Sequence, residues 1–317
     1  MTRTKEYSRK QGGISILKQY WDNGVLGTAL IQCLLLGKNK TALEILQLSV
    51  DLKKKKRFVK RYRQVLMDFD QHWVDNYIHH KRKTVWMFWW QGEDVMPELV
   101  KRCYTSVKEN MSDWEIVLLT KQNYKEYASF PDYIMEKLKS GIITLTHFSD
   151  LLRLELLIKH GGLWLDATVL CTSGVVPNSI LKSDLFLYRP QKPGSDGKAK
   201  TLSSWLIWAK SNNKILKATQ TLLYKYWQDK NFLEDDYLLH QFMSIVMDFY
   251  LKESNKIPPF CNSIPHILLL HLFDPYNEQY WNDLKQMACF HKLSYKLNKE
   301  DLGKKNTYYD IIIAQEI

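Results

Sequence analysis

The sequence predicts an α/β domain with a parallel sheet, preceded by a helical and strongly basic N-terminal extension. From Thr84 onward, short runs of β-forming residues alternate with segments of helical periodicity, which is typical of a parallel sheet covered by helices. Before Thr84, apolar residues recur at intervals of three and four positions. We therefore divide the chain into an extension, residues 1–83, and an α/β domain, residues 84–317.

Four helices are expected in the extension, with Gly or Asn at the breaks between them. They cover Ile14–Tyr20, Val25–Leu36, Ala42–Leu52 and Phe58–Tyr77. The second is the most hydrophobic segment of the chain, but it is shorter than the roughly 20 residues that a membrane span needs. The opening MTRTKEYSRKQGG has no apolar signal-peptide core. We expect a protein that is soluble or peripherally bound to a membrane.

The excess positive charge lies entirely in the extension. Residues 1–83 contain 18 Lys and Arg against 7 Asp and Glu, whereas the rest of the chain has 27 of each. The charge is densest at Lys53–Arg57, where the sequence reads KKKKR. A solvated helix face is the ordinary use of such a run. An anionic membrane surface or a nucleic acid would also attract it, because both reward clustered cations.

Two features of the composition bear on the class of protein. The five cysteines are widely spaced and include no C-x-x-C pair. This pattern disfavours a disulfide framework and a zinc site, and it indicates a reducing compartment. Aromatic residues make up 13% of the chain, and they often line sites for bases and sugars, although core packing is their commoner use.

Strands and helices then alternate along the α/β domain. The expected strands are TVWMFWW (84–90), WEIVLL (114–119), DLFLYR (184–189) and SSWLIWA (203–209). The expected helices run from Pro97 to Asn110, over Tyr124–Ser129 and Tyr133–Lys139, and near residues 213–228 and 236–251. Residues 191–200 are expected to form a surface loop, and a polar tail ends the sequence.

The segment 149–168, SDLLRLELLIKHGGLWLDAT, carries the strongest functional pattern. Ser149 or Asp150 can cap a helix, because each offers an oxygen to the free amides of the first turn. Arg153 shares a helix face with Asp150, and a plain ion pair is the structural alternative for the two.

The second half of this segment leads a carboxylate to the edge of the sheet. Gly161-Gly162 ends the helix, and Leu163–Leu165 forms a buried strand that delivers Asp166 to the carboxyl edge. Ligands of α/β proteins gather at that edge, so Asp166 is better placed for binding than for packing.

This order of parts resembles the sugar-nucleotide signature of glycosyltransferases with a GT-A fold. The resemblance is strongest to bacterial capsular polysaccharide synthesis proteins, relatives of the yeast-type mannosyltransferases with a DXD motif and of the glucosylating clostridial toxins. It implies a GT-A-like, nucleotide-sugar-binding sheet of the Rossmann type. It also implies transfer of a hexose from a nucleotide diphosphate sugar, expected to be a UDP-sugar, to a lipid-linked or growing polysaccharide. Retention of configuration follows from the resemblance alone.

The resemblance assigns the first strand to the base of the donor. Trp89 or Trp90, with Gln91 and Gly92, matches the motif whose aromatic ring packs on uracil. The structural alternative for these aromatics is a place in the core.

The resemblance assigns the segment after residue 149 to the sugar and the diphosphate. Asp150 and Arg153 match the pair that holds hydroxyls of the donor sugar, and Gly162 belongs to the same signature. Asp166 matches the first acidic residue of DXD, which contacts the ribose and the metal-bound diphosphate.

The motif departs from DXD at its third position, where Thr168 replaces the second Asp. That carboxylate usually binds the divalent ion, and a hydroxyl is a poorer ligand for Mg²⁺ or Mn²⁺. A divalent cation remains the expected cofactor, with Asp166 and His291 as candidate ligands, but the substitution weakens this expectation. A catalytically silent, sugar-nucleotide-binding homologue is therefore an alternative function.

Basic residues near the end of the sequence could neutralise the diphosphate in place of a metal. A leaving diphosphate needs a metal ion or basic side chains around it. His291 and Lys292, in the segment HKLSYK, are expected to close over it. A solvated basic loop is an equal alternative.

A further acidic residue is expected near the acceptor. Asp236 and His240 are four residues apart on one predicted helix face, and a cap by Asp235 is the structural alternative for this cluster. Asp236, with Asp166 and Arg153, forms the expected catalytic set.

The basic extension suggests a location and one rival function. We expect it to hold the protein at the inner, cytoplasmic face of the bacterial plasma membrane, beside a lipid-linked acceptor. A nucleic-acid-binding protein would interleave cations with exposed aromatics, whereas Lys53–Arg63 contains only Phe58 and Tyr62. No nucleic acid partner is expected.

Overall fold

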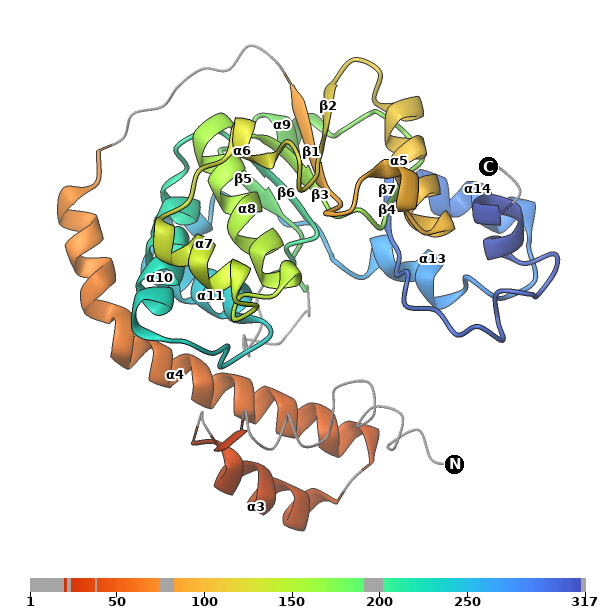
Figure 1. Ribbon diagram of the computed structural model, residues 1–317. Coiled ribbons are helices and arrows are strands. Elements are labelled where there is room, and N and C mark those ends of the chain that lie inside the picture. Colours follow the sequence, from red (N-terminus) through yellow and green to blue (C-terminus); the bar gives the residue numbers. More distant parts are fainter. Residues whose placement is uncertain (1–19, 22–23, 38, 75–82, 191–201, 315–317) are drawn as a thin grey trace.

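The computed structural model describes residues 20–21, 24–37, 39–74, 83–190 and 202–314, and its centre is a five-stranded sheet (Figure 1). The strands are β1 (Thr84–Phe88), β2 (Glu115–Leu119), β3 (Gly162–Leu165), β5 (Leu185–Leu187) and β6 (Leu206–Ala209), in the order β2-β1-β3-β6-β5. β1 pairs in parallel with β2 and β3, whereas β6 runs antiparallel to β3 and β5. The predicted α/β class is confirmed, and the sheet is parallel-rich rather than fully parallel, because β6 runs against its two neighbours.

Side chains alternate between the two faces of the sheet, and helices cover each face. Trp86 and Trp164 pack with α8 (Leu145–His160), α10 (Lys214–Asp229) and α11 (Leu238–Phe249). Val85 and Leu163, their neighbours in sequence, pack on the other face with α5 (Glu98–Asn110). This alternation follows from the period of two along a strand. Shorter helices complete the layers: η1 (Glu93–Val95), α6 (Tyr124–Tyr127), α7 (Asp132–Lys139) and α9 (Asn178–Leu181).

Helix α4 (Lys40–His72) is 33 residues long and continuous, although the sequence predicted two helices with a break near Lys53–Arg57. The prediction of a break was wrong because Lys and Arg are good helix formers and the run contains no Gly or Pro. Parts of two predicted helices, residues 14–19 and 75–77, lie outside the described residues, as does the expected loop at 191–200.

Half of the lysines in the basic run fix α4 to the α/β domain. Lys54 forms a buried ion pair with Asp235, with 3.0 Å between Nζ and Oδ2. The Nζ of Lys55 lies 2.6 Å from Oδ2 of Asp248, and it also donates to the hydroxyl of Ser244. Asp248 and Ser244 belong to α11, and Asp235 lies just before it. The run is therefore not a single solvated face.

The other two lysines are exposed, and they belong to a helix pair in which α3 (Leu26–Leu36) packs against α4 through a small cluster around Ala29 and Val50. Lys53 donates to the hydroxyl of Thr28 on α3, and Lys56 is exposed one turn further along α4. We call the exposed side chains of this helix pair the hairpin surface: Leu30, Ile31, Leu34, Leu35, Lys53 and Lys56.

Residues after α12 (Leu251–Ser254) fold into a packed unit instead of the expected polar tail. The elements α13 (Ile267–Leu270), α14 (Glu278–Met287) and the π-helical η3 (Tyr309–Ala314) gather with α5 around a third hydrophobic cluster, and η2 (Ile264–His266) lies beside α13. The prediction was wrong because these elements are short and their apolar residues are spread among charged ones. Strand β7 (Phe290–Lys292) then pairs antiparallel with β4 (Val169–Cys171), directly after the Asp166 segment.

The described helices were also compared with the dimensions of a bilayer. Within the ranges given above, no helix combines the length and the apolar character needed to cross a membrane. The apolar helix α3 is 11 residues long, about half of a span.

Candidate active site

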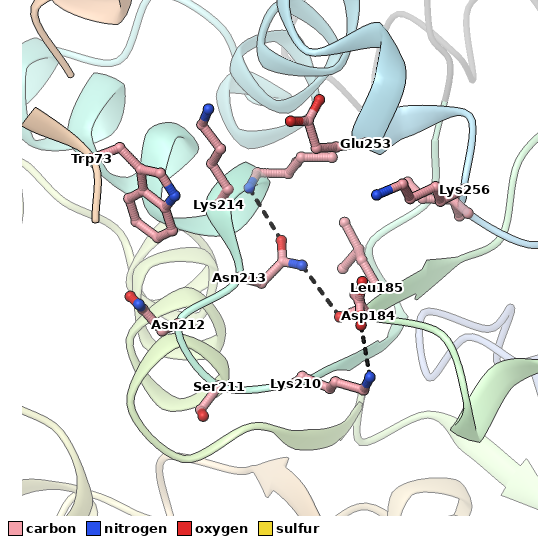
Figure 2. A pocket seen from close by; sticks show the side chains of 12 residues that line it. Trp73, Asp184, Leu185, Lys210, Ser211, Asn212, Asn213, Lys214, Glu253 and Lys256 are labelled. Carbon is pink, nitrogen blue, oxygen red and sulfur yellow. Dashed lines mark hydrogen bonds and ion pairs between the residues drawn. The ribbon is translucent and has the colours of Figure 1, made fainter. Parts of the chain in front are cut away.

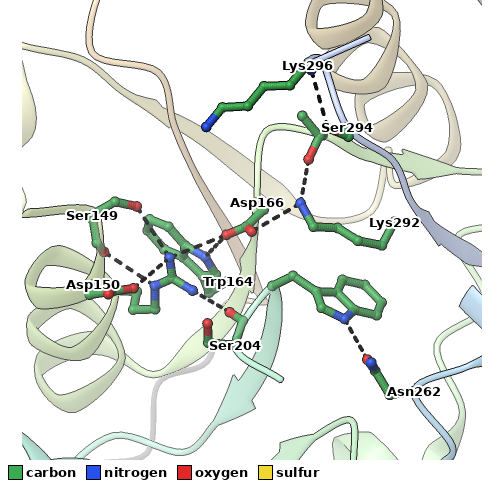
Figure 3. Close-up of polar contacts among 12 residues, drawn as sticks. Ser149, Asp150, Trp164, Asp166, Ser204, Asn262, Lys292, Ser294 and Lys296 are labelled. Atoms are coloured by element: carbon green, nitrogen blue, oxygen red, sulfur yellow. Dashed lines mark hydrogen bonds and ion pairs between the residues drawn. The ribbon is translucent and has the colours of Figure 1, made fainter. Parts of the chain in front are cut away.

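Asp166 follows β3 at the carboxyl edge of the sheet, where the sequence placed it. Its amide donates to the carbonyl of Trp205, at 2.8 Å, because β3 and β6 pair antiparallel up to Leu165 and Leu206. The indole Nε1 of Trp164 donates to Oδ1 of Asp166, at 3.0 Å. The Asp166 side chain remains 27% exposed, so it is held by the protein and open to a ligand (Figure 3).

Arg153 lies beside this carboxylate and connects it to the rest of the site. Its Nη2 is 3.1 Å from Oδ1 of Asp150 and 3.5 Å from Oδ1 of Asp166. Its Nη1 donates to the backbone carbonyl of Ser204, and the guanidinium lies over the Trp164 ring, 5.0 Å from the centroid. With 6% of its side chain exposed, Arg153 holds both carboxylates in position.

Asp150 and Arg153 lie inside α8, not at its start. The helix begins earlier because the hydroxyl of Thr144 accepts a hydrogen bond from the backbone amide of His147 and so caps the first turn. The interpretation of Ser149 or Asp150 as the cap was therefore wrong. The spacing of three residues still places Asp150 and Arg153 on one helix face, as expected.

Asp150 is a buried carboxylate that stays ionised. Burial alone would raise the pKa of its carboxyl, but Arg153 and His147 favour the charged form, so the pKa falls below its usual range. The Nδ1 of His147 lies 3.6 Å from Asp150, and its ring meets Trp227 edge-on. These contacts provide a fixed negative charge beneath the edge of the sheet.

A lysine from the C-terminal unit completes the site. The register of β4 and β7 places Lys292 opposite Val169. Its Nζ lies 3.3 Å from Oδ2 of Asp166 and donates to Oγ1 of Thr168. Asp166 therefore lies between two cations, with Arg153 near one oxygen and Lys292 near the other (Figure 3).

The neighbouring His291 faces away from this cluster, because successive residues of a strand point to opposite faces. Its ring packs against Trp281, with 5.5 Å between the centroids, and its Nε2 lies 3.4 Å from the hydroxyl of Thr172. Burial lowers the pKa of the imidazole to about 4. The structure does not bring His291 to Asp166, its expected partner in a metal site.

Of the two tryptophans expected at the base of the donor, Trp89 lies closer to the Lys292 segment. Its ring meets Tyr295 edge-on, with 5.7 Å between the centroids. Trp90 packs instead against Tyr124 and the main core. The geometry therefore favours Trp89 as the aromatic surface at the site.

The two motif glycines, Gly92 and Gly162, permit backbone conformations and contacts that a larger residue would hinder. Gly92 follows Gln91 in the turn after β1 and has a φ of 94°, which favours glycine. Gly162 lies at the opposite end of β3 from Asp166. A Cβ at Gly162 would lie 2.6 Å from the backbone oxygen of Thr84, so this glycine permits the close approach of β3 to β1.

The first turn of α11 brings His240 to the site. Asp236 is exposed ahead of the helix, whereas the Nε2 of His240 lies 3.1 Å from the hydroxyl of Ser204. Asp235, the expected cap, accepts the amide of Tyr237 just before the helix begins. The structure thus places His240, rather than Asp236, next to a residue that contacts Arg153.

Sequence reasoning missed three residues of this edge: Ser204, Trp205 and Asn262. Trp205 stacks on Tyr188, with 4.8 Å between the ring centroids, and donates from its indole to Asn262, at 2.9 Å. A signal was present, because Ser204 and Trp205 lie at the start of the predicted strand 203–209. They lie opposite Asp166 only if that strand runs antiparallel to β3, and the sequence pattern predicted parallel strands.

The family model described as capsular polysaccharide synthesis protein matches residues 39–312. The chain belongs to this family. Its membership agrees with the GT-A-like α/β fold expected from the sequence.

Two curated relatives and one solved structure are similar to this family member. O-glycosyltransferase PaGT of Phomopsis amygdali is 24% identical over 166 residues, which are 47% of this chain and 40% of the relative. O-glycosyltransferase braB of Annulohypoxylon truncatum is 33% identical over 94 residues, 27% of this chain and 22% of the relative. The matches thus span less than half of each relative. The PaToxG glycosyltransferase structure is similar over 82% of this chain and 95% of its own, with 15% identity and a TM-score of 0.38.

A hollow of about 440 Å³ lies at the other edge of the sheet (Figure 2). It is lined by residues that follow β6 and begin α10, and two of its lysines are paired. Lys210 lies 2.7 Å from Asp184, and Lys214 lies 2.7 Å from Asp70. Ligands of α/β proteins gather at the carboxyl ends of the parallel strands, whereas this hollow adjoins the amino end of β3. The candidate functional site of this family member is therefore the Asp166 cluster.

Proposed function

We propose that the protein is a glycosyltransferase that moves a hexose from a UDP-sugar to a lipid-linked or growing polysaccharide, in the synthesis of a bacterial capsule or surface polysaccharide. One observation carries the proposal: Asp150, Arg153 and Asp166 converge at the carboxyl edge of the sheet, with Asp166 open to solvent. The description of the family and the names of the two curated relatives support the same class of reaction.

In the proposed complex, Asp166 accepts hydrogen bonds from the ribose hydroxyls, because it is the exposed carboxylate of the cluster, and it reaches the diphosphate only through the cations beside it. Asp150 and Arg153 are almost buried, so their main task is to hold Asp166, and hydroxyls of the sugar reach only their edges. Trp89, with Tyr295 at its edge, offers an aromatic surface for the uracil base. Asp236 remains the proposed residue on the acceptor side.

The proposed transfer breaks the bond between C1 of the sugar and an oxygen of the β-phosphate. The electron pair of that bond leaves with the nucleoside diphosphate, while the oxygen of an acceptor hydroxyl bonds to C1 and its proton passes to the departing diphosphate. Two cations flank Asp166, which makes this carboxylate a weak nucleophile. If configuration is retained, as the resemblance implies, we therefore expect the transfer to proceed without a covalent glycosyl-enzyme intermediate on Asp166.

Turnover of a panel of UDP- and GDP-sugars by the wild type and by Asp166→Asn tests the proposal. The variant removes charge without changing volume, and turnover should fall by about 10²–10³-fold, as for loss of one electrostatic contact to a transition state. Asp184→Asn is the matched control, because Asp184 is an exposed aspartate at the opposite edge of the sheet. Full turnover by Asp166→Asn would make the cluster structural. A wild type that binds donors but never turns them over would support the silent homologue.

We further propose that the hairpin surface holds the protein on the anionic, cytoplasmic face of the membrane, where a lipid-linked acceptor lies. The exposed fraction of its leucines reaches 85% at Leu34 and 75% at Leu35, and Lys53 and Lys56 of α4 add exposed positive charge to the same helix pair. At such a surface, the apolar side chains insert into the membrane while anionic lipids attract the lysines. Each lysine near the membrane contributes about 1 kcal/mol to the binding free energy. No nucleic acid partner is proposed.

Co-sedimentation with vesicles of anionic phospholipid tests the hairpin surface. Leu34→Glu with Leu35→Glu should reduce binding, and so should Lys53→Gln with Lys56→Gln, whose effect should fade at high salt. Leu270→Glu is the control, because Leu270 is 76% exposed but lies on α13. Hydrolysis of the soluble donor should not change in any of these variants. Equal sedimentation of all of them would refute the proposal.

A further inference from the structure

The cation that lies at the donor motif is a lysine. The Nζ of Lys292 is 3.3 Å from Oδ2 of Asp166, and it donates to the hydroxyl of Thr168 (Figure 3). A DXD motif would carry a second carboxylate at the position of Thr168. Here the motif has one carboxylate and one hydroxyl, and both contact an ammonium group.

The sheet, rather than the flexible stem of the side chain, sets the place of Lys292. The amide of Leu293 donates to the carbonyl of Thr168, at 2.8 Å, and Lys292 lies opposite Val169 in the antiparallel pair. Because His291 is buried on one face of β7, alternation directs Lys292 to the other face, toward the site. The Lys292 side chain is 19% exposed, so its ammonium is reachable by a ligand but confined.

The side chains around Asp166 do not fit a divalent ion. Mg²⁺ and Mn²⁺ take several oxygen ligands and favour charged ones. Oδ1 of Asp166 accepts from Trp164 and faces Arg153, while Oδ2 faces Lys292. In the described part of the chain, no three His, Cys, Asp or Glu side chains are grouped in a way that could hold a metal. An ion at this carboxylate would also be repelled by two neighbouring positive charges.

We propose that Lys292 takes the place of the divalent ion, so that the protein binds the diphosphate of its donor without a metal. This inference rests on the proposed function, because its ligand is a nucleoside diphosphate. An ammonium group has three N–H donors. One stays on Thr168 while another turns from Asp166 to a phosphate oxygen. The positive charge then offsets the negative charge that grows on the leaving diphosphate.

Calorimetric titration with UDP, once with EDTA and once with Mn²⁺, tests the inference without relying on turnover. The wild type should bind UDP with a dissociation constant that differs by less than about twofold between the two conditions, far below the tenfold that 1.4 kcal/mol would give. Lys292→Met should weaken binding about tenfold or more, as expected for the loss of a charged hydrogen bond. Lys292→Arg keeps the charge and should retain binding with EDTA. Lys299→Met, at an exposed lysine further along the same segment, is the matched control.

A second variant tests the exchange of cations directly. Thr168→Asp combined with Lys292→Met rebuilds a motif with two carboxylates and no lysine, so UDP binding should become dependent on Mn²⁺. Loss of wild-type UDP binding in EDTA, or unchanged binding by a correctly folded Lys292→Met, would overturn the inference and leave the proposed function intact. If the wild type binds neither UDP nor GDP with or without Mn²⁺, the proposed function fails as well.

Discussion

The buried ion pair between Lys54 and Asp235 offers a quantitative test of how α4 is attached to the α/β domain. In Lys54→Gln, Asp235 loses its ionic partner. Because the two side chains are only 4% and 5% exposed, water cannot replace that partner. Removing one partner of a buried pair costs about 3–5 kcal/mol, because the remaining charge is left uncompensated. At roughly 2–4 °C for each kcal/mol, the melting temperature should fall by about 6–20 °C.

Thermal and urea unfolding, followed by circular dichroism and by limited proteolysis of α4, measure this effect. Lys56→Gln is the matched control, because Lys56 is an exposed lysine two positions away on the same helix. Its free energy of unfolding should stay within about 0.5 kcal/mol of the wild type. Lys54→Met with Asp235→Leu removes both charges and should recover most of the loss. If Lys54→Gln and Lys56→Gln melt alike, this pair does not anchor α4 and the reasoning is refuted.

Two further predictions concern Arg153 and His291. Arg153→Lys keeps the charge but loses the planar guanidinium that joins Asp150, Asp166 and a backbone carbonyl. Turnover should therefore fall about 10²-fold, and the free energy of unfolding should fall by about 1–3 kcal/mol. Normal turnover would show that Arg153 forms only a structural ion pair. The buried imidazole of His291, with its pKa lowered to about 4, stays neutral in the folded protein and takes up a proton on unfolding below about pH 6.5. Stability should therefore rise with pH between these values, and urea unfolding of His291→Phe across this range should show a smaller slope. An equal slope in the variant would assign the pH dependence to other groups.

The position of Asp166 could be predicted from sequence because it depends on local signals only. An apolar helix, two glycines and a short buried strand follow one another within one segment, and each has its own chemical reason. A residue that directly follows such a strand must lie at the carboxyl edge, wherever the strand pairs. The same holds for Asp150 and Arg153, because a spacing of three residues fixes their common helix face whatever the exact start of the helix.

Contacts across long stretches of chain could not be predicted in the same way. Ser204 and Trp205 join the site because β6 runs antiparallel to β3. The composition of a short apolar strand does not determine the direction in which the strand pairs. The sequence named Lys292 as a candidate to neutralise the diphosphate, but it named the neighbouring His291 for the same role. Only the pairing of β7 with β4 decides which of the two faces Asp166.

The basic run shows how the pairing of charges changes the meaning of a charge count. Counted along the sequence, its cations belong to an extension that is separate from the donor site. In the structure, Lys54 pairs with Asp235 at the start of α11, and His240 on that helix contacts Ser204, whose carbonyl receives Arg153. Two sets of polar contacts, joined by the first turn of α11, therefore connect α4 with the carboxylates of the candidate site. The division of the chain at residue 83 into an extension and an α/β domain stays a prediction from the sequence pattern. In the structure, α4 belongs to the extension by that division, yet it supports the site in the α/β domain.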